Sequence, residues 1–138
     1  MPALFRRLCA YAWAAPNSLL GLAAGAAMLC CGGRARVVHG VVEFYGGALA
    51  ALAVAAPPAL RFCAVTFGHV ILGTDSATLV AVRVHEHVHV RQYQAWGPLF
   101  LFAYLASSVW QLARGQRAYR DNYFERQAYA AERHGREL

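Results

Sequence analysis

Apolar residues are concentrated in a few long runs, and the longest run lies near the N-terminus. Residues 10–31 contain no charged side chain over 22 positions, and arginines lie on both sides of this run. About 20 apolar residues are enough for a helix to cross the hydrocarbon core of a bilayer. We therefore expect an N-terminal membrane helix, with residues 1–36 comprising this helix and its flanks and residues 37–138 forming a second domain.

Three residues inside this run bear on where its helix begins. Asn17 and Ser18 follow Pro16, and either is suited to cap a shorter helix. A cleaved signal peptide is the rival interpretation, but the run is long for such a segment and no clear cleavage site precedes a polar region. We expect the helix to be retained, and the arginines on both flanks leave its orientation open.

The middle of the chain carries strand patterns. Residues 37–45 are β-branched and aromatic with glycines around them, which predicts a strand or hairpin. Residues 46–56 are rich in Ala and Leu but are too short for an easy membrane span, so we expect a short buried or interfacial helix. Residues 61–72 predict one further strand, which ends at a polar turn over residues 73–76.

The remaining sequence predicts helices. Asp75 or Ser76 is suited to cap a helix that begins near residue 77 and runs to about residue 96, before a Gly-Pro pair. An apolar helix over residues 99–113 follows, and an Asp-Asn pair caps a last helix over residues 123–133. The predicted fold is α+β and mostly helical, with a short sheet before the central helix.

A competing strand pattern runs through residues 78–96. Valines and histidines alternate there, and strict period two in β-branched residues favours a strand. In a strand, His85, His87 and His89 would share one face and could bind a metal as some all-β sites do. An uninterrupted strand of this length would be far longer than usual, so we favour the helix.

Composition favours contact with a membrane. Of the 138 residues, 59% are hydrophobic and only 14% are charged, whereas soluble domains carry nearer to about a quarter charged residues. The net charge is +6, and all 13 basic residues are arginine. There is no dense basic run with interleaved aromatics, so we expect membrane lipid and not nucleic acid as a partner.

The four cysteines give no sign of a disulfide or a zinc site. Cys30 and Cys31 are adjacent, which is poor geometry for a disulfide, and no pair has the two-residue spacing of zinc ligands. We expect these two, together with Cys9 and Cys63, to be small buried residues.

The candidate chemistry lies in the segment His85-Glu86-His87-Val88-His89, which matches the pattern His-Glu-x-x-His. Positions i and i+4 share one face of a helix, so His85 and His89 can offer imidazole nitrogens to one ion. Glu86 lies about a hundred degrees round the helix from His85, beside the ion without binding it. From there it can act as general base and acid, while Zn²⁺ lowers the pKa of a bound water to about 7.

A catalytic zinc needs a third protein ligand. We favour Glu125, in the first turn of the last helix, because Ala128 is small enough to let that helix approach the first one. Glu132 and Asp121 remain alternatives. This set predicts hydrolysis of a peptide or protein substrate by a zinc-activated water. A non-catalytic metal site that stabilises a small membrane protein is the alternative.

Five other residues are considered for the site. In the helix, His87 is expected to point away from the metal. His69 is expected to end the strand before the active helix, where it is either a plain polar residue or an oxyanion-binding group. Tyr104, Tyr119 and Tyr123 are candidate oxyanion stabilisers.

Most of the chain also carries a family resemblance. The segments that carry it are Pro-Asn-Ser-Leu-Leu-Gly-Leu at 16–22, Gly-His-Val-Ile-Leu-Gly at 68–73, His-Glu-x-Val-His-Val-Arg-Gln-Tyr at 85–93, Trp-Gly-Pro-Leu-Phe at 96–100 and Tyr-Arg-Asp-Asn-x-Phe-Glu-Arg at 119–126. They resemble a family of small, uncharacterised bacterial membrane proteins with a zincin-like site. This resemblance implies a location in the bacterial cytoplasmic (inner) membrane.

More broadly, the motif with a later Glu-x-x-Ala is similar to gluzincin metallopeptidases. This resemblance implies a minimal zincin-like fold, zinc bound by His85, His89 and Glu125, and Glu86 as general base. The chain departs from the pattern at Tyr129, where related membrane gluzincins often have an acidic residue that orients a zinc-bound histidine. We therefore expect weaker support for one of the two histidines.

Overall fold

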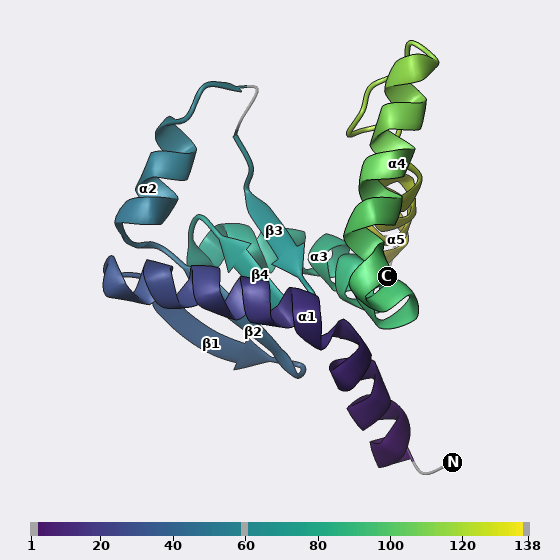
Figure 1. Ribbon diagram of the computed structural model, residues 1–138. Helices are drawn as coiled ribbons and strands as arrows, with labels where there is room; N and C mark the ends of the chain where they lie inside the picture. Colours follow the sequence, from purple (N-terminus) through teal and green to yellow (C-terminus); the bar gives the residue numbers. More distant parts are fainter. Residues whose placement is uncertain (1–2, 59–60, 137–138) are drawn as a thin grey trace.

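The computed structural model describes residues 3–58 and 61–136, which form an α+β fold (Figure 1). In chain order the elements are α1 Ala3–Cys30, β1 Arg34–Val38, β2 Val41–Tyr45, α2 Gly47–Ala55, β3 Ala64–Phe67, β4 Val70–Gly73, α3 Ser76–Trp96, the 3-10 helix η2 Gly97–Leu99, α4 Phe100–Ala113 and α5 Tyr123–Arg136. The predicted α+β class, with a short sheet before the central helix, is confirmed.

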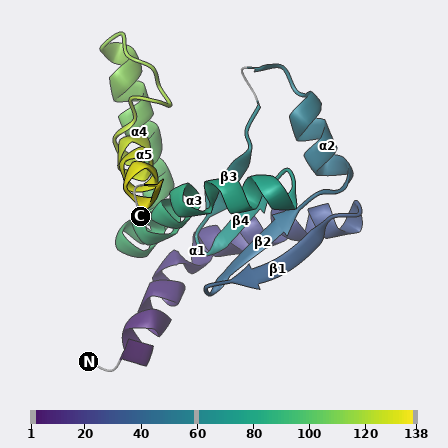
Figure 2. The same cartoon turned by 180° about the vertical axis from the view of Figure 1, so that it is seen from behind.

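The sheet has the strand order β1-β2-β4-β3 and lies between α1 on one face and α3 on the other (Figures 1 and 2). β2 and β4 are parallel, whereas the two outer pairs are antiparallel. Side chains alternate along β4: Val70 and Leu72 pack with Met28 of α1, and Ile71 packs with Leu79 of α3. The central strand is therefore buried on both faces, which fixes α3 against the sheet.

Residues 37–45, which were predicted to form a strand or hairpin, belong to the β1–β2 hairpin, whose first strand begins earlier, at Arg34. His39 and Gly40 connect the strands and have positive φ angles of 51° and 80°. Positive φ at both central residues is the geometry of the two-residue turn that suits the twist of a hairpin.

The single strand predicted over residues 61–72 is wrong, because the chain reverses at Gly68 and His69 and forms the β3–β4 hairpin. Gly68 has a φ of 60°, and a side chain there would collide with Ser18 of α1. The backbone N–H of His69 donates to Ser18 Oγ at 3.0 Å. Contact with α1 therefore stabilises a turn where the local pattern of β-branched residues favours a continuous strand.

Helix α1 does not begin at Asn17 or Ser18, as in the shorter alternative, but continues through Pro16. Its N-terminal half has a visible bend (Figure 1). Proline removes one helical hydrogen bond and commonly kinks a helix. Asn17 lies within α1 and is buried, and its side-chain amide donates to the carbonyl of Gly97 at 3.0 Å. This tertiary bond uses the Asn17 side chain that would otherwise cap a helix.

One narrow face of α1 packs against the sheet and the rest is exposed. Gly21 and Gly25 lie on the buried face and leave room for Val70 and Phe44. By length and composition α1 is apolar enough to cross a membrane. Its exposed large apolar residues include Leu4, Leu8, Leu19, Leu20, Leu22 and Leu29.

The prediction that the cysteines are buried is wrong, since all four are exposed. Cys9 and Cys30 lie on α1 away from the face that contacts the sheet, and Cys31 lies just beyond its end. Cys63 precedes β3 on an exposed connection. The apolar surroundings in the sequence therefore reflect an exposed apolar surface and not a core.

Residues 76–96 form the helix α3, so the strand alternative for residues 78–96 is wrong. Asp75 is its N-cap: its carboxylate accepts from the backbone N–H of Thr78 at 2.8 Å and from the Thr78 hydroxyl at 2.6 Å. The cap and the packing of Leu79 and Tyr93 outweigh the strand preference of the valines.

The last two helices pack together beside the C-terminal half of α3. The α4 helix ends at Ala113, before Gly115 with a φ of 70°, as the sequence predicted. Asn122 caps α5 by accepting from the backbone N–H of Phe124 at 2.9 Å. Helices α2 and α4 extend from the body of the fold on the same side in both views (Figures 1 and 2).

Candidate metal centre

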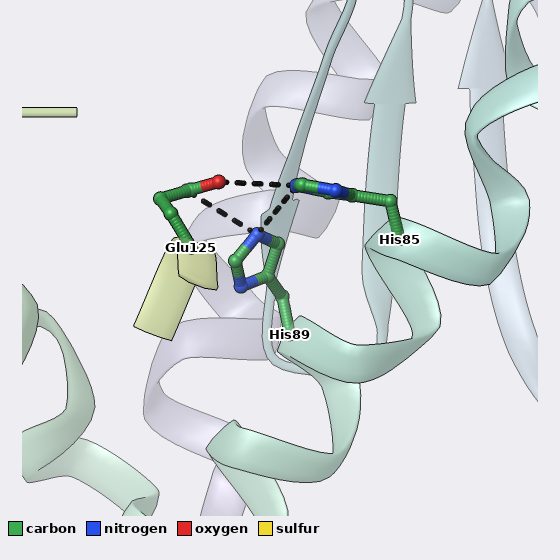
Figure 3. A group of neighbouring side chains, drawn as sticks. All are labelled: His85, His89 and Glu125. Carbon is green, nitrogen blue, oxygen red and sulfur yellow. Dashed lines mark hydrogen bonds and ion pairs between the residues drawn. The ribbon is translucent and has the colours of Figure 1, made fainter. Parts of the chain in front are cut away.

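His85, His89 and Glu125 lie together and form a buried group that could hold a metal ion (Figure 3). His85 Nε2 lies 3.1 Å from Glu125 Oε2 and 3.2 Å from His89 Nε2, and His89 Nε2 lies 3.3 Å from Glu125 Oε1. Ligands at about 2.0–2.1 Å from a tetrahedral zinc ion are separated by about 3.3 Å. The donor types and their close approach therefore suit a single metal ion.

The two histidines lie on one face of α3 and the glutamate lies in the first turn of α5. Ala128, one turn after Glu125, is completely buried and allows α5 to lie close to α3. Asp121, one of the alternative ligands, is paired with Arg117 at 3.1 Å outside this group.

His89 is oriented by Gln92, which the sequence analysis did not single out. His89 Nδ1 lies 2.8 Å from Gln92 Oε1, so the ring donates from Nδ1 and directs the Nε2 lone pair toward the other ligands. The amide nitrogen of Gln92 donates to the carbonyl of Phe124 at 3.1 Å and to Gln127 Oε1 at 2.9 Å. Gln92 thus connects a ligand on α3 with the helix that carries Glu125. The sequence signal for this role of Gln92 is its position three residues after His89, on the same side of the helix.

The other alternative ligand, Glu132, lies near His85. Glu132 Oε2 lies 3.7 Å from His85 Nδ1, on the opposite side of the ring from the Glu125 contact at Nε2. Tyr129 packs its ring edge-on against His85 with a centroid distance of 4.8 Å. An acidic residue, which is missing at position 129, is therefore present near His85 at Glu132, on the same face of α5 as Glu125.

Glu86 is buried beside the three ligands and is held by Thr66 of β3, whose hydroxyl donates to Glu86 Oε2 at 2.7 Å. Burial raises the pKa of Glu86, against the attraction of His89 and His85. Thr66 was not predicted, because it lies 20 residues away in the sequence and no local pattern marks it.

Glu125 has the opposite electrostatic environment. Burial by itself would raise its pKa, but hydrogen bonds with His85, His89 and Tyr104 lower the pKa of Glu125 to about 2. The hydroxyl of Tyr104 donates to Glu125 Oε1 at 2.8 Å. The carboxylate is therefore ionised at neutral pH, as a metal ligand requires.

The remaining predicted residues lie around this group. Of the three candidate tyrosines, Tyr104 donates a hydrogen bond to Glu125. Tyr119 and Tyr123 are about half exposed. His87 points away from the ligands, and its ring lies edge-on to His39 at 6.1 Å. His69 is buried in the β3–β4 turn, where it stacks on Tyr11.

Comparison of the chain with protein-family models, curated proteins and solved structures finds no match. The resemblance to gluzincins thus stays a prediction from the motif. What supports a function is the arrangement of the side chains themselves.

Proposed function

We propose that this protein is a membrane-associated zinc metallopeptidase. The observation that carries the proposal is the joint placement of three buried ligands and the buried carboxylate of Glu86 next to them. Two histidines and one glutamate form the ligand set of several zinc peptidases, and the adjacent glutamate is their proton carrier.

The residues of this chain have distinct roles in the proposed reaction. When bound, zinc supplies a water with a lowered pKa and polarises the scissile carbonyl. Glu86 accepts the proton of the attacking water and then donates it to the departing amine. Its raised pKa favours this exchange, and the Thr66 hydroxyl holds the carboxylate in place.

The position of β3 supports a peptide as substrate. Among the described strands β3 pairs only with β4 and is thus an edge strand, the kind of position at which extended peptides add to sheets. Thr66 lies on this strand and contacts Glu86. A peptide added to the sheet along β3 would therefore pass close to the catalytic carboxylate.

Exposed apolar helices support a location at a membrane, which we assign to the bacterial cytoplasmic membrane. Leu99 at the end of η2 and four residues of α4 follow one another at helical spacing and are all more than half exposed; the α4 residues are Phe102, Leu105, Val109 and Leu112. The outer surface of α1 also exposes many large apolar side chains. Large exposed apolar surfaces are uncommon on soluble monomers.

A non-catalytic metal site is the second candidate, and the burial of all three ligands favours it. Structural zinc sites are closed, whereas catalytic sites keep a position for water. The side chains of His85, His89 and Glu125 are only 7%, 9% and 3% exposed.

Comparison of wild type with Glu86→Gln separates the two candidates. Both proteins, purified in detergent with zinc, are incubated with a mixed library of fluorogenic peptides, and cleavage is read by mass spectrometry. Cleavage by wild type that the variant lacks, with equal zinc content in both, supports the peptidase. Absence of cleavage by zinc-loaded wild type contradicts it and favours the structural site.

A further inference from the structure

A strongly basic cleft lies on the other side of Tyr129 from the metal centre. It has a volume of about 580 Å³ and lies along α5 and the segment that precedes it. Its lining residues are Arg117, Arg120, Tyr123, Arg126, Gln127, Tyr129, Ala130 and Arg133. None of these eight described residues is acidic.

The basic character of the cleft follows from the two faces of α5. Glu125 and Glu132 are seven residues apart and face the histidines. Arg126 and Arg133 are also seven residues apart and line the cleft, so they form a separate stripe on the same helix. Asp121 pairs with Arg117, and the guanidinium groups of Arg120, Arg126 and Arg133 add further positive charge.

Tyr129 connects the cleft with the metal centre. One contact of its ring is with His85, at a centroid distance of 4.8 Å, and Arg120 lies over the ring at 5.8 Å. A group bound between the arginines is thus separated from a metal ligand by a single aromatic side chain. A peptide bound at the metal would reach the cleft within a few residues, because an extended chain advances about 3.3 Å per residue.

We propose that this cleft binds acidic side chains of the peptide substrate, so that the protein prefers peptides with Asp or Glu near the cleaved bond. Arginine binds carboxylates through paired, charge-assisted hydrogen bonds, which suits it to this role. The identification of the ligand as a peptide rests on the proposed peptidase function, whereas the ability of the cleft to bind anions rests on its arginines alone.

The test uses a zinc-loaded Glu86→Gln protein in a non-ionic detergent, so that bound peptide is not cleaved. A fluorescent decapeptide with alternating Glu is compared with the same peptide carrying Gln, by anisotropy. We expect Arg126→Gln/Arg133→Gln, added to this parent, to weaken binding of the acidic peptide about tenfold. The matched control is Arg34→Gln/Arg114→Gln, which removes the same charge from exposed positions outside the cleft and should change affinity less than about twofold.

Equal loss in both double variants would overturn the proposal, since binding would then depend on net charge alone. Failure of the acidic peptide to bind better than its Gln counterpart would overturn it too. If the cleft arginines were needed for binding of phosphatidylglycerol vesicles and no peptide bound, the ligand of the cleft would be a lipid headgroup and the peptide proposal would be wrong. Zinc content equal to that of the parent shows that each variant is folded. Because no turnover is measured, failure of the peptidase proposal gives a different result from failure of this one.

Discussion

Gln92 Oε1 accepts a hydrogen bond from His89 Nδ1 at 2.8 Å, and the same side chain holds the backbone of α5 through Phe124. One glutamine therefore fixes both the tautomer of His89, a proposed metal ligand, and the position of the helix that carries Glu125. Partners of this kind commonly change metal affinity by about 10- to 100-fold.

We predict that Gln92→Leu weakens zinc binding within that range without abolishing it. The loss arises because His89 is no longer held in the tautomer that presents Nε2 to the metal. Competition with a fluorescent zinc chelator measures the affinity. Gln94→Leu on the same helix is the control and should leave zinc affinity unchanged. Equal affinities for wild type and Gln92→Leu would show that Gln92 does not orient the ligand.

Substitution of the two alternative acidic residues is expected to reduce zinc affinity less than substitution of Glu125. Glu132→Gln should lower zinc affinity by no more than about tenfold, because it removes a carboxylate that lies 3.7 Å from His85 Nδ1 but no direct ligand. Asp121→Asn should have no effect, since its partner is Arg117. Isothermal titration with zinc distinguishes these cases. If Glu132→Gln abolished binding, Glu132 and not Glu125 would be the third ligand.

Thr66→Val should separate catalysis from metal binding. The variant keeps the zinc ligands but removes the hydrogen bond that positions the Glu86 carboxylate. On a peptide that wild type cleaves, we expect kcat to fall about tenfold, the cost of one hydrogen bond to a charged group, with unchanged zinc content. Thr74→Val, on the connection before α3, is the control. Unchanged kcat in Thr66→Val would remove Thr66 from the proposed mechanism.

Acid should destabilise the fold through Glu43, which is fully buried between Arg36 and Arg83 at 2.6 Å and 2.9 Å. Burial opposes ionisation, but both arginines together lower the pKa of Glu43 below its ordinary value of 4.5. A lowered folded-state pKa gives stability that is present above pH 4.5 and is lost as the pH falls through the folded-state pKa.

Glu43→Gln should therefore lower the free energy of unfolding at pH 7 by about 2 kcal/mol, because two partly exposed guanidinium groups lose their buried charged partner. The variant should also lose less stability than wild type between about pH 5 and about pH 3, because Glu43 becomes protonated below its ordinary pKa of 4.5 in the unfolded wild type. Denaturant titrations of wild type and variant over this range measure both effects. An unchanged acid dependence in the variant would assign that dependence to other groups.

Much of the architecture could be predicted because the relevant signals are local. Asp75 precedes a helix, Gly115 ends one, and the i, i+4 spacing of His85 and His89 requires only helical geometry. Glu125 was identified because it lies one turn before a small residue that allows two helices to approach.

The features that were missed or wrongly predicted depend on contacts between distant segments. The turn at His69 depends on Ser18, and the role of Thr66 depends on Glu86. Pro16 lies within a helix that tertiary packing holds together, and the cysteines are exposed because only one face of that helix is covered. No pattern within a short window contains this information.

The central claim is that His85, His89 and Glu125 bind one zinc ion, and metal analysis tests it most directly. Wild type, His89→Ala, Glu125→Ala and the control His87→Ala are purified in detergent without chelators and measured by mass spectrometry for metal per chain. We predict one zinc in wild type and His87→Ala, and none in His89→Ala or Glu125→Ala. A wild-type protein without metal, or a Glu125→Ala variant that keeps its zinc, would contradict this account.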